Sequence, residues 1–167
     1  MLTDLTKIDW EDIIKQEAPA VKEDVLKTAS ERNGHEKPGA RLAYFCTMGV
    51  ECAKAGKRTL LISLDYPVGM VMRKLFSICL NEPFPPGSEA TPEKIEAVRN
   101  VVGDRILIFT PPVPGFSLKA LNEILLRHPK TDIVVFDNIM IVNRTTNKIS
   151  SKDLRDIAVK HKVAVVT

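Results

Sequence analysis

The chain has 167 residues, of which 44% are hydrophobic and 27% charged, and this composition fits one globular domain with a continuous buried core. Its 24 basic and 21 acidic residues are scattered, so the net charge of +3 forms no dense basic arm of the kind that binds nucleic acid. No apolar run approaches the roughly 18 residues of a membrane span and no signal sequence opens the chain, so we expect a cytoplasmic protein without a membrane partner.

Residues 9–18 (DWEDIIKQEA) have the pattern of a short amphipathic helix, and they stand outside the pattern of the remaining chain. We therefore divide the chain into an N-terminal helix and linker, residues 1–24, and an α/β domain, residues 25–167. The apolar side of the helix either docks in the groove of a partner protein or packs on its own domain. This side consists of Trp10, Ile13 and Ile14.

The rest of the chain alternates strands and helices. We expect strands at 25–29, 59–64, 106–109, 132–137 and 162–167. We expect helices at 39–55, 68–80, 92–102, 117–127 and 150–161. The apolar runs in four of the strands are nearly continuous, which indicates a parallel sheet covered on both faces. The sequence therefore predicts an α/β fold with a doubly wound, mainly parallel five-stranded sheet.

The segment at residues 34–41 (GHEKPGAR) has the glycine spacing of a phosphate-binding loop. The motif G-x-x-x-x-G-K-[ST] needs a lysine that reaches the terminal phosphates and a hydroxyl that holds magnesium. Ala40 and Arg41 occupy those two positions here. The loop therefore lacks the side chains with which such a motif grips a magnesium-bound triphosphate.

Two interpretations of this loop stay open. Gly34 and Gly39 allow backbone N–H groups at the start of a helix to contact a phosphate, with Lys37 or Arg41 supplying positive charge. Alternatively, the segment is a solvent-exposed connection whose glycines and charges are ordinary loop composition. Pro38 favours the second interpretation, since it removes one N–H donor from the cradle.

Asp137 ends the strand expected at 132–137. In open α/β folds, ligands bind at the carboxyl edge of the sheet, where this side chain is expected to lie. As a structural residue, Asp137 would instead cap the following turn through Asn138 and its neighbours.

The order of these segments resembles the RecA-type ATPase core of hexameric replicative helicases of the DnaB and phage primase-helicase kind. The resemblance covers about residues 25–167 and is carried by AGKRTLLISLDYPVGMVMRKLFSICLN and TDIVVFDNIMIV. It implies a minimal RecA-like P-loop NTPase fold, in which the strand at 162–166 lies between the Asp137 strand and the strand at 25–29. It also implies that Asp137 occupies the Walker B position, where it would hold magnesium through water.

The resemblance further places Asp65 where these enzymes carry the acid that activates water, so Asp65 is the candidate catalytic residue. Its carboxylate is one carbon shorter than that of the usual glutamate, and a base that cannot reach the attacking water is inactive. We therefore predict a catalytically inactive RecA/DnaB-helicase-like domain without a cofactor. It would act as an interaction or regulatory module that binds itself or a replication or recombination ATPase.

The alternative function is a nucleotide-binding, helicase-like ATPase that uses ATP and magnesium through a non-standard phosphate loop. In that alternative, Lys37 and Arg41 would replace the missing lysine, and the chain would be part of a longer helicase. The polar segment at 143–152 follows the Asp137 strand. In hexameric helicases, loops that project from this side of the sheet contact DNA. The basic residues of this segment either meet the phosphates of single-stranded DNA or face solvent. They are Arg144, Lys148 and Lys152.

Three further sets of residues receive structural interpretations. Tyr44, Tyr66 and Phe84 are expected in the core rather than stacked on nucleic-acid bases. Cys46, Cys52 and Cys79 lack zinc-site spacing and are expected to be buried thiols. His35, His128 and His161 share no common spacing, so we expect no metal site, and the last two suit the ends of helices.

Overall fold

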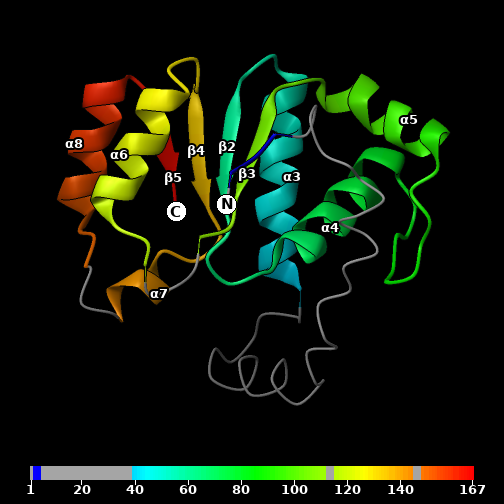
Figure 1. Cartoon of the computed structure of the whole chain (residues 1–167), viewed down its shortest axis with the longest axis horizontal. Coiled ribbons are helices and arrows are strands. Elements are labelled where there is room, and N and C mark those ends of the chain that lie inside the picture. The colour runs from blue at the N-terminus through cyan, green and yellow to red at the C-terminus, as the bar shows by residue number, and fades with distance from the viewer. Residues whose placement is uncertain (1, 5–38, 112–114, 145–147) are drawn as a thin grey trace.

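A sheet lies between two layers of helices in the computed structural model (Figure 1). The structure describes residues 2–4, 39–111, 115–144 and 148–167. The strand order in the sheet is β1-β3-β2-β4-β5. The four parallel strands are β2 (Thr59–Ile62), β3 (Ile106–Phe109), β4 (Ile133–Phe136) and β5 (Ala164–Val166). Strand β1 (Leu2–Asp4) pairs with β3 in the antiparallel direction.

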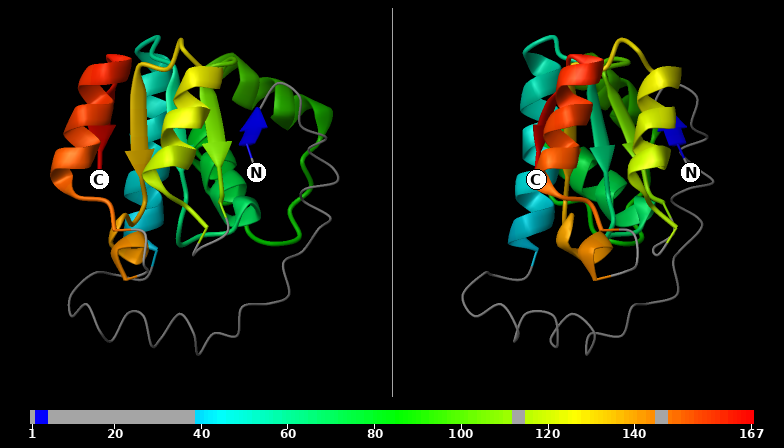
Figure 2. Two further views of the ribbon diagram at one scale, coloured as in Figure 1. Left: turned by 60° about the vertical axis from the view of Figure 1, so that its left-hand side comes forward. Right: turned by 90° about the vertical axis from the view of Figure 1, so that its left-hand side faces the viewer.

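Helices cover both faces of the sheet (Figures 1 and 2). One face is covered by α3 (Ala40–Lys54), α4 (Val68–Leu80) and α5 (Pro92–Val102). The other face is covered by α6 (Leu118–Arg127) and α8 (Ser151–His161). The short helix α7 (Met140–Asn143) follows β4 at the carboxyl edge of the sheet.

Strand β2 shows how the apolar runs produce this layered architecture. Successive side chains of a strand point to opposite faces of a sheet. Leu61 accordingly packs among α3, α4 and α5, whereas Leu60 and Ile62 pack among α6 and α8. All residues of β2 are buried, because the strand has a layer of helices on each side.

The polar groups at the amino ends of the strands are joined through Arg58. Its backbone N–H donates to Oδ2 of Asp132 at 2.8 Å, and its carbonyl accepts from the N–H groups of Asp132 and Ile133. One guanidinium nitrogen of Arg58 lies 2.8 Å from a carboxylate oxygen of Asp104. The residue before β2 is therefore bound to the residues that precede β3 and β4.

The architecture confirms an α/β fold and is compatible with the predicted doubly wound sheet. Every strand and helix expected between residues 39 and 167 is present, and α4, α5 and β3 have the predicted bounds. Strand β5 pairs with β4, the strand that leads into Asp137. The resemblance implied this pairing. Four strands of the sheet are parallel, while the fifth is β1, which the sequence analysis did not predict. The strand at 25–29, the helix at 9–18 and the boundary between 1–24 and 25–167 lie outside the described residues.

Three of the predicted helices begin with side chains that cap a helix start. Thr91 accepts a hydrogen bond from the third residue of α5, and Pro92 occupies the first helical position. Ser117 caps α6 through the N–H of Ala120. Ser150 and Asp153 form a reciprocal capping box at α8. These caps explain why the helix boundaries were readable from the sequence.

The prediction of burial is confirmed for Phe84 and Cys46, is met only in part by Tyr66, Cys52 and Cys79, and is wrong for Tyr44. Phe84 is buried with its ring centroid 5.0 Å from that of Phe76, and Tyr66 packs against the same core. Tyr44 is 61% exposed, so its prediction as a core residue is wrong. Helix α3 turns this side chain outward, away from the face that contacts the sheet. Cys46 is buried, while two other thiols, Cys52 and Cys79, are half-buried.

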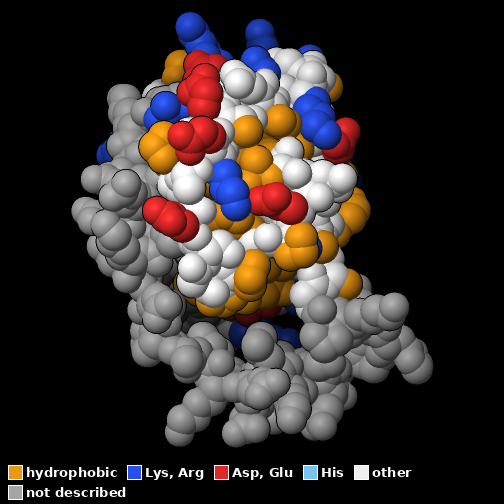
Figure 3. All heavy atoms as spheres, turned by 90° about the vertical axis from the view of Figure 1, so that its right-hand side faces the viewer, with side chains coloured by type: hydrophobic (Ala, Val, Ile, Leu, Met, Phe, Trp, Pro, Cys, Tyr) orange, Lys and Arg blue, Asp and Glu red, His pale blue; other side chains and the backbone are white. Residues whose placement is uncertain are grey.

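The outer surface near α4 and α5 is mixed in character. Figure 3 shows hydrophobic, basic and acidic side chains interspersed on the coloured part of this side of the molecule. None of the helices in the described part of the chain has the length and apolar character that a membrane crossing requires.

Helix α3 approaches the sheet closely at Gly49. A Cβ atom added to Gly49 would lie 2.9 Å from Cδ1 of Leu61, which is closer than such atoms approach in real structures. Leu61 is fully buried in β2, so its side chain has no free space to move into. The absence of a side chain at Gly49 thus sets the distance between α3 and the sheet.

We expect Gly49→Ala to lower the free energy of unfolding by about 1–3 kcal/mol, because overpacking against Leu61 outweighs the higher helix propensity of alanine. Gly69→Ala is the matched control, since its added Cβ would meet only the end of the Arg73 side chain at 3.5 Å. The control should be neutral or stabilised by up to about 1 kcal/mol. Urea unfolding followed by circular dichroism measures both, and equal effects of the two substitutions would contradict the packing argument.

Candidate functional site

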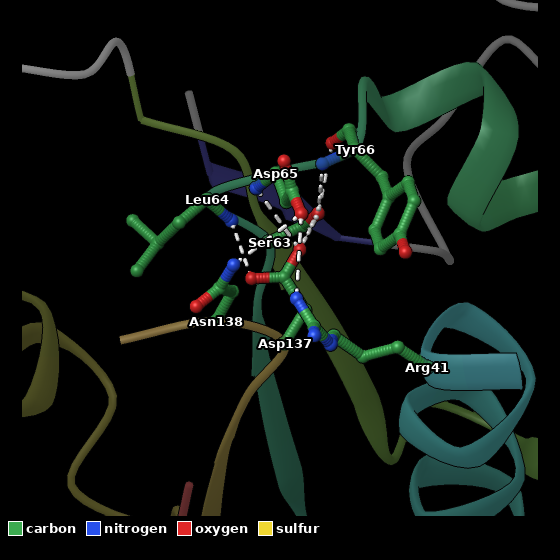
Figure 4. A network of polar contacts seen from close by, with 7 residues as sticks. All are labelled: Arg41, Ser63, Leu64, Asp65, Tyr66, Asp137 and Asn138. Atoms are coloured by element: carbon green, nitrogen blue, oxygen red, sulfur yellow. Dashed lines mark hydrogen bonds and ion pairs between the residues drawn. The ribbon is translucent and has the colours of Figure 1, made fainter. Parts of the chain in front are cut away.

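The candidate site lies at the carboxyl ends of β2 and β4, which are neighbours in the sheet. The chain leaves β2 after Ile62, and the next residues turn toward Asp137 at the end of β4 (Figure 4). The sequence analysis expected β2 to span residues 59–64. It ends two residues earlier because the hydroxyl of Ser63 and the N–H of Leu64 bind the Asp137 carboxylate.

Both oxygens of the Asp137 carboxylate are engaged by the segment after β2. The N–H of Leu64 donates to Oδ1 at 2.8 Å, and the N–H of Asp65 donates to Oδ2 at 3.1 Å. Oγ of Ser63 lies 2.7 Å from Oδ2. The backbone N–H of Asp137 also donates to the carbonyl of Ile62 at 3.3 Å. Asp137 is only 7% exposed, so these protein groups replace water around its carboxylate.

The hydroxyl of Ser63 has two acceptors within reach but only one proton. Its Oγ lies 2.7 Å from Oδ2 of Asp137 and 2.8 Å from the carbonyl oxygen of Tyr66. When Asp137 is ionised, the hydroxyl satisfies one of these two oxygens. When Asp137 is protonated, its own proton can be donated to Oγ, and Ser63 then donates to the carbonyl of Tyr66. The geometry therefore accommodates a protonated Asp137 with both contacts satisfied.

The pKa of Asp137 is raised above its usual value, and burial is the largest cause. The hydrogen bonds from Leu64, Ser63 and Asp65 lower this pKa, because they favour the ionised carboxylate, and the nearby Asp65 carboxylate raises it further. Burial outweighs the hydrogen bonds. The raised pKa of Asp137 agrees with the arrangement in which protonated Asp137 donates to Oγ of Ser63 and Ser63 donates to the carbonyl of Tyr66.

Asp65 lies beside Asp137 with its side chain 39% exposed. Its Oδ2 is 3.8 Å from a guanidinium nitrogen of Arg41, which reaches across from the first turn of α3 (Figure 4). The side-chain amide of Asn138 donates to the same oxygen at 3.4 Å. Arg41 stands where a phosphate-binding loop carries its hydroxyl, and it contacts the carboxylate that the resemblance assigns to catalysis.

The start of α3 retains one feature of an anion-binding turn. Gly39 adopts a left-handed conformation with φ of 82°, which a glycine adopts without steric cost. No side chain caps this helix start through a hydrogen bond within the described residues. Backbone N–H groups at a helix start favour negative charge. Gly34 and Lys37, the other predicted phosphate-binding residues, lie outside the described residues.

The structure thus brings four of the predicted site residues to one place: Gly39, Arg41, Asp65 and Asp137. The prediction that Asp137 caps the following turn through Asn138 is wrong. The side chain instead contacts Ser63, Leu64 and Asp65, because these groups are next to it across the sheet. The sequence analysis missed Ser63, for which the only signal was a hydroxyl at the end of an apolar strand.

The polar segment at 143–152 is attached to the fold at both of its ends. The side-chain oxygen of Asn143 accepts from the N–H of Ile149 at 2.8 Å, and Ile149 is buried. Lys152 lies in the first turn of α8, while Arg144 ends α7, which the sequence analysis did not predict. Two of the predicted DNA-contacting residues therefore lie at helix ends, Arg144 directly after α7 and Lys152 in the first turn of α8. The partner-binding residues Trp10, Ile13 and Ile14 lie outside the described residues.

No group of three or more His, Cys, Asp or Glu side chains in the described residues is arranged to hold a metal ion. His128 caps the end of α6, and His161 is the last residue of α8, as predicted for helix ends. The ring of His161 lies 2.9 Å from Oδ1 of Asn122. Burial, followed by the neighbouring Lys160, lowers the pKa of His161. The sequence comparisons add no assignment to this site, because neither the known family models nor the curated proteins contain a match to the chain.

We expect Asp137→Ala to lower the free energy of unfolding by about 3 kcal/mol, because it leaves two N–H groups and one hydroxyl without their acceptor. Asp65→Ala is the matched control at the same site and should cost less than about 1 kcal/mol, since its ion pair is exposed. Chemical denaturation of the two variants measures the difference. If Asp65→Ala were as costly as Asp137→Ala, the structural role assigned to Asp137 would be wrong.

The raised pKa of Asp137 predicts how stability depends on pH. A carboxyl group with a raised pKa holds its proton more tightly in the folded than in the unfolded chain, so its favourable contribution is present at low pH. This contribution is lost as the pH rises from the ordinary value of 3.8 through the raised pKa. The free energy of unfolding of the wild type minus that of Asp137→Asn should therefore fall across this range. A difference that rises with pH would mean that the hydrogen bonds outweigh burial.

Proposed function

We propose that the chain is a catalytically inactive RecA/DnaB-helicase-like domain that functions as a protein-binding module. The proposal rests on the family resemblance together with the contacts of the Asp137 carboxylate. The described architecture, with four parallel strands and helices on both faces, is compatible with the proposal.

The engaged carboxylate of Asp137 is the observation that carries the proposal. A carboxylate that holds magnesium through water must direct its lone pairs at the hydrated ion. Asp137 has about four lone-pair sites, and Leu64, Ser63 and Asp65 approach its two oxygens. If the carboxylate oxygens of Asp137 bound a metal ion instead, the buried groups of Leu64, Ser63 and Asp65 would lose their acceptor. This loss costs about 1–3 kcal/mol for each such group.

The position of Arg41 adds an electrostatic argument. Its guanidinium lies 3.8 Å from Asp65, on the side of the site where the resemblance would place a magnesium ion. A fixed positive charge repels a divalent cation, so Arg41 disfavours a magnesium ion beside Asp65.

Two exposed hydrophobic side chains support a protein partner at the same edge. Tyr44 on α3 is 61% exposed and Met140 at the start of α7 is 60% exposed. Both helices begin at the carboxyl edge of the sheet. Aromatic residues, methionine and arginine are enriched at protein interfaces. We infer that this edge contacts a second copy of the chain or an ATPase of the RecA or DnaB type.

The turn before α3 favours a second candidate function, the binding of a nucleotide as an ATPase. Gly39 leaves the helix start open to an anion, and Arg41, two residues later, carries positive charge. Against this candidate, the carboxylates of Asp65 and Asp137 face the same region and would repel a triphosphate that has no metal.

Isothermal titration with magnesium-ATP distinguishes the two functions. We expect no binding heat from the wild-type chain, because the site lacks a lysine and its magnesium ligand is engaged. The double variant Ala40→Lys/Arg41→Thr restores both missing side chains, and we expect it to remain unable to hydrolyse ATP because Asp137 is unchanged. Micromolar binding to the wild type would establish the nucleotide-binding alternative in place of the inactive module.

Sedimentation velocity over a concentration series tests the protein-binding part of the proposal. We expect the chain to associate with itself or with an added RecA- or DnaB-type ATPase. The variant Tyr44→Ser/Met140→Ser should weaken this association. Leu126→Ser/Val159→Ser is the matched control, since these residues are also more than half exposed but lie on α6 and α8. If the two variants associated equally strongly, the carboxyl edge would not be the contact surface.

A further inference from the structure

A basic pocket lies at the amino edge of the sheet, opposite the Asp137 site. It is formed where β2, β3 and β4 begin and where α6 ends. In Figure 1 this edge is at the top, whereas α7 and the carboxyl edge are at the bottom. Its charged lining residues are Arg58, Asp104, Arg105, Arg127 and Lys130.

The pocket concentrates the positive charge of the chain. Four of its lining side chains are Arg or Lys and one is Asp, with His128 counted as neutral. The lining therefore carries a charge of +3, which equals the net charge of all 167 residues. The sequence shows no basic cluster. The positive charge gathers at the pocket because folding brings separate segments of the chain together. Figure 3 shows Lys and Arg side chains along the upper rim of the molecule, at the same end.

Two of the guanidinium groups are held in place by the protein. Arg58 is paired with Asp104 at 2.8 Å, and Nε of Arg105 donates to the carbonyl of Ala53 at 2.8 Å. Each guanidinium has five N–H donors, so these contacts orient the group and leave other donors available. Positioned arginine donors match the oxygens of a phosphate group.

The other two cations lie at the end of α6 and in the turn that follows it. Arg127 and Lys130 are exposed, and neither side chain has a hydrogen bond or ion pair with another described residue. The turn between them is fixed, because the N–H and the hydroxyl of Thr131 both donate to the carbonyl of His128. The negative end of the α6 dipole favours a cation at Arg127. It does not explain Arg58 and Arg105, which belong to other segments, or Lys130, which lies beyond the end of the helix.

The size of the pocket limits the ligand. Its volume is about 190 Å³. Pockets that enclose a drug-sized molecule measure about 300–1,000 Å³. The pocket is therefore too small to enclose a whole nucleotide, but it suits one tetrahedral anion.

We propose that this pocket binds a phosphate group, supplied by inorganic phosphate or by the backbone of single-stranded DNA. The site is separate from the one that carries the proposed function and does not depend on it. It also differs from the basic residues at 143–152, which follow β4 at the opposite edge of the sheet.

The test uses the full chain and two variants of equal charge. Arg127→Glu/Lys130→Glu alters the pocket, and Arg99→Glu/Arg155→Glu is the control, because these arginines are exposed and do not line it. Each pair of substitutions changes the net charge from +3 to −1. Sodium phosphate is titrated at constant ionic strength while the backbone amide signals of Thr59 and Thr131 are followed by NMR. A labelled oligodeoxythymidylate is titrated in parallel by fluorescence anisotropy.

We expect phosphate to shift both amide signals in the wild type and in the control variant. The pocket variant should bind at least about tenfold more weakly, since it loses two charge-assisted contacts. If the oligonucleotide loses affinity in the same variant, a backbone phosphodiester is a ligand of the pocket. If the oligonucleotide does not bind, or binds all variants equally, free phosphate is the ligand.

The proposal is overturned if phosphate shifts neither amide signal in the wild type, or if the pocket variant and the control variant bind it equally. Equal thermal unfolding midpoints of the two variants show that the substitutions leave the fold intact. If the Arg127→Glu/Lys130→Glu variant is unfolded, Arg127→Gln/Lys130→Gln replaces it. This second variant should also bind phosphate more weakly than the wild type.

Discussion

The carboxylate of Asp137 joins the ends of two neighbouring parallel strands, and the geometry of the site depends on it. The chain after β2 turns toward Asp137 because Ser63, Leu64 and Asp65 all direct polar hydrogens at its oxygens. This turn places the Asp65 side chain within reach of Arg41 on α3. One buried acidic side chain thus determines the path of the loop and the arrangement of the charges around it.

The two edges of the sheet differ in how far their charges are balanced. At the carboxyl edge, where open α/β folds bind ligands, both acidic residues have protein partners. At the amino edge, Arg58 is paired with Asp104, while Arg127 and Lys130 remain in excess. Folding has therefore moved the unbalanced charge to the edge where a ligand was not expected from the sequence. The two proposals therefore concern opposite edges of the sheet.

Local features of the sequence predicted the helices and strands well, because they depend on near neighbours. Pro92 and Ser117 define helix starts through contacts within one turn. The contacts of the site depend on residues far apart in the chain. Ser63 and Asp137 are 74 positions apart, so no local pattern identifies them as partners. The polar three-residue strand β1 has no periodic signal, and the grouping of Arg58 and Arg105 with Arg127 and Lys130 appears only when three segments come together.

Strand β2 has attachments on every side. It has a hydrogen-bonded neighbour along each edge and a helical layer on each face. Arg58 connects its beginning to Asp132, and Asp137 connects its end to β4. A strand joined in this way cannot separate from the sheet unless both neighbouring strands are disturbed. Its amide hydrogens should consequently exchange with solvent only when the whole domain unfolds.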